Sequence, residues 1–153
     1  MTGRETKESN DLFFVCSLIE YISRATNNHR SVVVNAIGSD KLQHLYNLAD
    51  VYHNENLKKV SDELVSTCHI PKGSFDNIAI CSYTVPTIWD IGKVYKRLIL
   101  DVAKYRDTTD YVEVLMNIYN SWISRKIEDF NSSMYFENPD YLLQSYLVGD
   151  VLV

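Results

Sequence analysis

The chain has 153 residues and a mass of 17.7 kDa, a length that suits one domain with an ordinary apolar core. Its composition is 46% hydrophobic and 23% charged, which argues against disorder. The 5 Gly and 3 Pro are too few for the many tight turns of an all-β sandwich. The net charge is −5, and residues 1–70 and 71–153 are each net acidic. Because non-specific nucleic-acid binding depends on neutralising phosphates, this charge argues against nucleic acid as a partner.

Cysteine usage and hydropathy indicate the compartment. The three cysteines, Cys16, Cys68 and Cys81, are odd in number and form no C-x-x-C pair, so neither a disulfide framework nor a zinc finger is expected. The polar start of the chain does not resemble a signal peptide. No apolar run approaches the roughly 20 residues of a membrane span. These features predict a cytoplasmic protein without membrane association.

The first part of the chain is expected to be helical. Residues 1–10 are polar and predict a disordered tail, followed by a helical half over 11–70. Asp11 is the expected N-cap of the first helix, and Gly38 is expected at a left-handed position between the second and third. The spacing of apolar residues predicts helices over residues 12–26, 32–37, 39–53 and 57–68.

A break follows at Pro71-Lys72-Gly73, and residues 71–86 are predicted to form an irregular connector. Within it, apolar residues nearly alternate over 75–85. This alternation is compatible with a strand or with an irregular segment that crosses the helices, and a lone strand is not stable. The sequence leaves these two possibilities open.

A second helical half is predicted over 87–153, with helices at residues 87–105, 110–130 and 139–147. Thr87 and Asp90 have the spacing of a capping box, and Asn138-Pro139 is a strong helix start. The fold class is therefore all-α. We expect a compact bundle of about seven helices, four in the N-terminal half and three in the C-terminal half, within a single domain.

Two features of the second half suggest a surface for a protein partner or for self-association. Basic residues gather on the helix over 87–105, and aromatic residues leave helical periodicity around residues 133–141. The alternative for the basic residues is an ordinary solvated helix face, and the alternative for the aromatic residues is that they close the core. Tyr suits half-buried positions and interfaces, and seven of the 11 Tyr fall between residues 95 and 146. The partner-binding candidates are Lys93, Arg97, Lys104, Tyr135, Phe136 and Tyr141.

An alternative reading concerns residues 31–53, where two helices joined by Gly38 resemble a helix-turn-helix. The DNA-binding candidates on the second helix are Lys41, Gln43 and His44. Gln43 has the chemistry to read adenine, but Asp40 would face phosphate unfavourably. A helical hairpin that packs into the core is the favoured interpretation.

No catalytic residues, metal ligands or cofactors are predicted. The five glycines are isolated, whereas a phosphate-binding loop needs several together. The histidines are scattered, and adjacent acidic residues fit solvated charge better than acid–base catalysis. Cys68 with His69, near Cys81, is the conceivable thiol site. We therefore expect a non-enzymatic protein.

Residues 12–70 also resemble a family of small, uncharacterised bacterial helical proteins, often encoded beside ADP-ribosyltransferase-like toxin domains. The similarity lies in a helix opened by aromatic residues, a short helix that ends at Gly38, and a Tyr/His-rich ending. The matching segments are Leu12-Phe13-Phe14-Val15, Ile19-Glu20-Tyr21, Leu45-Tyr46 and Asp50-Val51-Tyr52-His53. The resemblance implies a non-enzymatic accessory or antitoxin-like binding protein.

Overall fold

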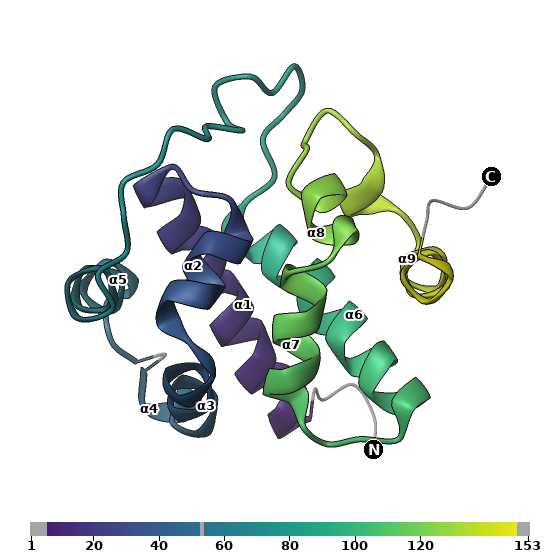
Figure 1. Cartoon of the computed structure of the whole chain (residues 1–153), viewed down its shortest axis with the longest axis horizontal. Coiled ribbons are helices and arrows are strands. Elements are labelled where there is room, and N and C mark those ends of the chain that lie inside the picture. The colour runs from purple at the N-terminus through teal and green to yellow at the C-terminus, as the bar shows by residue number, and fades with distance from the viewer. Residues whose placement is uncertain (1–5, 53, 150–153) are drawn as a thin grey trace.

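The computed structural model describes residues 6–52 and 54–149, and within these residues the chain is all-α (Figure 1). The predicted fold class is confirmed, and the described residues contain no strand. The described residues form nine α-helices and one short 3-10 helix: α1 (Lys7–Thr26), α2 (Arg30–Ile37), α3 (Ser39–Asn47), α4 (Ala49–Tyr52), α5 (Leu57–Thr67), α6 (Ile88–Arg106), α7 (Tyr111–Tyr119), α8 (Trp122–Ile127), η1 (Met134–Phe136) and α9 (Pro139–Val148).

The first helix begins earlier than the sequence predicted. Its N-cap is Thr6, whose side chain accepts a hydrogen bond from the backbone N–H of Ser9. Asp11, the expected cap, instead lies buried inside the helix and pairs with Lys7 at 2.6 Å. The predicted tail over 1–10 is therefore helical from Lys7 onward, and residues 1–5 lie outside the described part. The end at Thr26 is as predicted, and Asn27 adopts the left-handed conformation.

The structure has more helices than the predicted seven because two expected helices are each broken in two. The predicted helix over 39–53 divides at Leu48 into α3 and α4; its last residue, His53, lies outside the described residues. The predicted helix over 110–130 divides at Asn120 and Ser121. There the Asn120 side chain donates to the Met116 carbonyl, and the Ser121 hydroxyl donates to the Ile118 carbonyl. Such local bonds compete with helix propagation.

The helix starts with the clearest sequence signals are confirmed. Thr87 and Asp90 form the reciprocal bonds of a capping box, at 3.0 and 2.9 Å. Asn138 caps α9 with Pro139 in its first turn. Gly38 has φ +82° and ψ 163°, which differs from the predicted left-handed helical conformation but is still a region that is essentially restricted to glycine.

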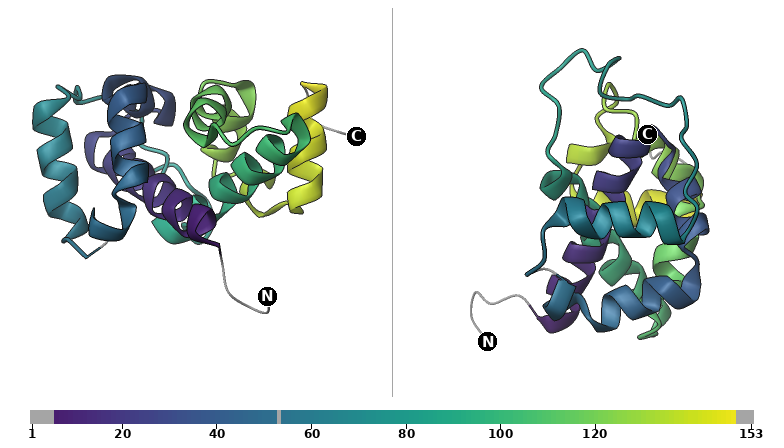
Figure 2. Two further views of the ribbon diagram at one scale, coloured as in Figure 1. Left: turned by 90° about the horizontal axis from the view of Figure 1, so that it is seen from below. Right: turned by 90° about the vertical axis from the view of Figure 1, so that its left-hand side faces the viewer.

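The core is organised around the packing of α1 against α6. These two helices cross at the centre of the molecule, with α5 and α9 at opposite ends (Figures 1 and 2). One cluster of buried apolar side chains extends from α1 through α9. The two predicted halves therefore share a core, with α1 packing on α2, α3 and α5 as well as on α6.

The connector between α5 and α6, residues 68–87, contains neither helix nor strand. Its first part is hydrogen-bonded to the end of α1: Gly73 N–H donates to the Thr26 carbonyl at 2.8 Å, and Phe75 N–H donates to the Asn27 carbonyl at 2.9 Å. Gly73 is required there, because a Cβ would lie 2.3 Å from the carbonyl oxygen of Asn27. Of the two possibilities left open for residues 75–85, the structure therefore shows the irregular segment.

The second part of the connector is bonded to the segment after α8. The amide of Asn131 accepts from the Ser82 N–H at 2.7 Å and donates to the Ile80 carbonyl at 2.9 Å. The buried Asn77 amide donates to the Glu128 carbonyl at 2.9 Å. The connector thus links the end of α1 to the end of α8.

A buried ion pair joins α1 to α2. The Arg30 and Glu20 side chains are each 1% exposed. The Arg30 Nε donates to Glu20 at 2.8 Å, and its Nη2 donates to the other carboxylate oxygen. Arg24 Nε adds a bond of 2.8 Å to the same carboxylate. Burial alone would raise the pKa of Glu20, but the adjacent positive charges of Arg30 and Arg24 outweigh it and hold this pKa below its usual value.

The crossing of α1 and α6 depends on Gly92. A Cβ at this position would lie 2.2 Å from the Oγ of Ser17 and 3.0 Å from its backbone N. In an unobstructed helix interior, Gly→Ala stabilises a protein by about 1 kcal/mol, whereas overpacking a close contact costs about 1–3 kcal/mol.

We predict that Gly92→Ala lowers the free energy of unfolding, by up to about 2 kcal/mol, as measured by urea denaturation followed by circular dichroism. Lys93→Ala, at the exposed neighbouring position, is the control and should change it by less than about 0.5 kcal/mol. An increase for Gly92→Ala would contradict the close crossing.

Candidate functional site

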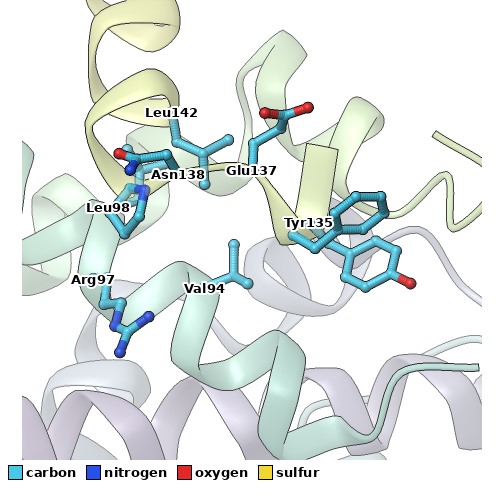
Figure 3. Close-up of a pocket in the computed structure, with 9 residues that line it drawn as sticks. Val94, Arg97, Leu98, Tyr135, Glu137, Asn138 and Leu142 are labelled. Atoms are coloured by element: carbon cyan, nitrogen blue, oxygen red, sulfur yellow. The ribbon is translucent and has the colours of Figure 1, made fainter. Parts of the chain in front are cut away.

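A groove lies between α6, η1 and the first turn of α9, with a cavity of about 240 Å³ (Figure 3). We call it the α6–α9 groove. Val94 and Leu98 of α6 and Leu142 of α9 form its apolar floor, while polar side chains lie at the rim. The lining residues are Val94, Arg97, Leu98, Tyr135, Phe136, Glu137, Asn138, Pro139 and Leu142.

Local sequence features position each wall of the groove. Val94 and Leu98 are one turn apart on α6, so both point to the same side. On the opposite wall, the Asn138 cap fixes where α9 begins and places Leu142 one turn further along. The short helix η1 holds its two aromatic rings edge to face, with the centroids of Tyr135 and Phe136 5.0 Å apart.

The structure brings three of the predicted partner-binding residues together. Arg97, Tyr135 and Phe136 line the α6–α9 groove, and Phe136 is 66% exposed. Lys104 lines a neighbouring hollow that shares Asn138 and Pro139 with the groove. Four of the six predicted residues thus line two adjoining hollows along α6, η1 and the start of α9.

The other two predicted residues do not line either hollow. Lys93 is exposed on α6, one turn before Arg97, and Tyr141 is half-buried against the core. Lys96, a further basic residue of this helix, is buried. Its Nζ donates to the Ser9 hydroxyl at 2.6 Å and lies 5.9 Å from the ring centroid of Phe13. The basic surface of α6 is therefore smaller than the sequence suggests.

The charges along this surface are of both signs. Arg97 and Lys104 are accompanied by three carboxylates, Asp101, Glu137 and Asp140. Partial burial raises the pKa of Asp101, although Lys104 opposes the shift. The surface is therefore of mixed charge and not uniformly basic.

The residues of the alternative DNA-binding reading lie on α3. Lys41 and Gln43 are half-buried and His44 is exposed, and the Gln43 amide donates to Asn47 at 2.9 Å. Gln43 also lines a hollow with three carboxylates, those of Asp40, Asp110 and Glu113. This acidic setting is unfavourable for the phosphate backbone of DNA.

The cysteines have local contacts. Cys16 is fully buried in α1, and burial raises the pKa of its thiol to about 12, so it is not a reactive nucleophile. Cys68 contacts the Thr67 hydroxyl at 3.8 Å, and the Cys81 thiol donates to the Tyr83 carbonyl at 3.3 Å. In the part of the chain that the structure describes, no group of three or more His, Cys, Asp or Glu side chains could hold a metal ion.

Sequence reasoning missed most of the groove floor. Val94, Leu98 and Leu142 read as ordinary core positions, because their helical spacing does not reveal that η1 leaves a hollow above them. Asn138 and Pro139 were recognised as a helix start and not as part of a surface. The useful signal was the loss of helical periodicity around Tyr135.

Comparison of the chain with protein-family models, curated proteins and solved structures found no match. Within residues 6–52 and 54–149, no helix has the length and apolar character needed to cross a membrane.

The three cysteines differ in burial, and this difference predicts which thiols react in the native protein. In the native protein, Ellman's reagent should titrate two thiols, those of the half-buried Cys68 and Cys81, and should reach the third only after denaturation. A Cys68→Ser/Cys81→Ser variant should show no fast reaction when folded and one thiol when unfolded. Rapid labelling of Cys16 in the folded variant would contradict the packing of α1.

Proposed function

We propose that this protein is a non-enzymatic interaction module that binds a segment of a protein partner in the α6–α9 groove. The observation that carries the proposal is the apolar floor of Val94, Leu98 and Leu142 beside the 66% exposed ring of Phe136. Interfaces are centred on well-packed apolar pockets with aromatic and Arg residues around them.

The groove suggests the chemistry of the bound segment. Its floor would accept an apolar side chain, and the guanidinium of Arg97 at the rim would pair with a carboxylate close to that side chain. Glu137, on the opposite rim, would favour a donor or a positive charge at a second position. A segment with one apolar anchor and charges of both signs fits this arrangement better than a uniformly acidic one.

The resemblance over residues 12–70 suggests the kind of partner. A toxin-like protein encoded nearby would be bound, and its activity blocked, by an antitoxin-like or accessory protein in the cytoplasm. In this proposal the shared N-terminal segment supports the fold and the groove of the C-terminal segment binds the partner. The competing occupant of the groove is a second copy of this chain. Light scattering of the purified protein would detect such self-association.

The test uses a photo-crosslinking amino acid placed at Phe136, followed by mass spectrometry of the crosslinked products in the native host. We expect a discrete protein partner whose crosslinking falls at least about tenfold in an Arg97→Glu variant, because the Arg–carboxylate pair is reversed into repulsion. The crosslinker at Val51, a 59% exposed residue of α4, is the matched control.

A second charge control is Lys58→Glu, which reverses an exposed charge on α5, far from the groove. It should leave the crosslink at position 136 unchanged. Equal crosslinking at positions 136 and 51, or an Arg97→Glu variant that behaves like wild type, would contradict the proposal.

A further inference from the structure

A second hollow adjoins η1, where the connector meets the segment after α8. Its volume is about 550 Å³, and it shares two lining residues, Tyr135 and Phe136, with the α6–α9 groove. The connector contributes Tyr83 and Thr84 to its wall, and the segment 130–133 contributes the rest. We call it the η1–connector hollow. The two aromatic residues of η1 therefore stand between two adjoining hollows.

The connector is held beside this hollow by the side chain of Asn131. The Asn131 amide accepts from the Ser82 N–H at 2.7 Å and donates to the Ile80 carbonyl at 2.9 Å. The thiol of Cys81 donates to the carbonyl of Tyr83 at 3.3 Å. These bonds fix the backbone on both sides of Ser82 and leave the ring of Tyr83 free to meet a partner.

Two aromatic rings at the hollow are open to solvent. Tyr83 is 69% exposed and Phe136 is 66% exposed, whereas Phe130, which is 2% exposed, only closes the floor. The ring of Phe136 is supported by Tyr135, with the ring centroids 5.0 Å apart, and the Tyr135 side chain points away from Leu98 of the α6–α9 groove (Figure 3). Exposed aromatic rings gathered at one hollow are typical of an interaction surface.

The polar groups of the η1–connector hollow are uncharged. Among the described residues, none that lines it carries a charge, whereas Arg97 and Glu137 line the α6–α9 groove. Within the same described part of the chain, the phenolic hydroxyls of Tyr83 and Tyr135 form no hydrogen bond. A free phenol can donate to a carbonyl oxygen. The hollow thus offers ring faces and neutral donors, and it offers nothing that would pair with a charge.

An extended stretch that contains proline matches these properties. A polyproline II helix has no internal hydrogen bonds, so its carbonyl groups remain available as acceptors. Grooves lined by aromatic rings bind such stretches, because the preformed conformation loses little entropy on binding. A charged stretch would lose its hydration in this hollow without gaining an ion pair.

We propose that the partner segment crosses η1 and places an uncharged, proline-containing stretch in the η1–connector hollow. This inference rests on the function proposed for the α6–α9 groove and extends it to the other side of Phe136. The charged part of the segment lies between Arg97 and Glu137, and the proline-containing part lies against Tyr83 and Phe136. Because Tyr135 and Phe136 line both hollows, one continuous segment can occupy both.

The experiment selects a random peptide library displayed on phage against the full chain and measures the affinity of the most enriched peptide by fluorescence anisotropy. We expect enriched peptides to carry proline residues together with an apolar residue next to an acidic one. Tyr83→Ala should weaken the selected peptide at least about tenfold through loss of a ring at the centre of the contact. The position is 69% exposed, so the variant should keep the circular dichroism spectrum of the wild type.

The matched control is Ile80→Ala. Ile80 is 65% exposed on the same connector but does not line the η1–connector hollow. Its replacement should change the affinity by no more than about twofold, as expected for a surface position outside the contact.

The outcomes separate this inference from the groove proposal. Selected peptides without proline, or a proline peptide whose affinity is unchanged by Tyr83→Ala, would overturn the inference and leave the groove proposal standing. Loss of affinity in Tyr83→Ala but not in Arg97→Glu would contradict the groove proposal and retain the hollow as a proline site. Failure of the wild-type chain to enrich any peptide would overturn both.

Discussion

The fold depends on the ion pair between Glu20 and Arg30, which is buried at the junction of α1 and α2. Removing two charges from water is costly, and the cost is offset only when each finds its partner with good geometry. Here one carboxylate meets two guanidiniums, those of Arg30 and Arg24. The Arg30 side chain also donates to the carbonyl of Asn28, so the pair fixes the turn between the two helices.

The two guanidiniums of this ion pair are connected to the α6–α9 groove through a series of aromatic contacts. The guanidiniums of Arg24 and Arg30 lie 5.3 and 6.0 Å from the centroid of the Phe130 ring. Phe130 in turn contacts Tyr135 edge to face at 5.8 Å, and Tyr135 contacts Phe136. A continuous series of side chains therefore joins the buried ion pair to the rim of the α6–α9 groove, and the groove is positioned by the core.

The sequence predicted two helix starts whose cause is local, but it placed the first helix start at Asp11 and not at Thr6. The starts of α6 at Thr87 and of α9 at Asn138 depend on the three residues that follow each cap. The end of α1 depends on the last few residues of that helix. The breaks at Leu48 and Asn120 were missed. At Asn120 the local bonds are supported by two bonds to Asn35, which is distant in sequence. The residues of the groove floor looked like core for the same reason: whether a hollow remains above them depends on η1, not on their own spacing.

Glu20 and Arg30 were also unrecognised, because a charged residue in a helix reads as solvent-facing until its partner is known. The hydrogen bonds of Glu128 likewise join the start of α2, the connector and the end of α8, three segments that the sequence separates widely. Contacts of this kind give no motif at short spacing. Three residues of the groove could be predicted from the sequence because their neighbours in sequence make them unusual. Arg97 belongs to a helix rich in basic residues, and Tyr135 and Phe136 are aromatic residues outside helical periodicity.

The most direct test of this account is a double-mutant cycle on the free energy of unfolding, with Glu20→Leu, Arg30→Met and the double variant. Each single change leaves a buried charge without its main partner and should cost about 3–5 kcal/mol. The double variant should cost less than the sum by at least about 2 kcal/mol, since neither charge is then left behind. Additive costs, within about 0.5 kcal/mol, would contradict the claim that this pair organises the fold.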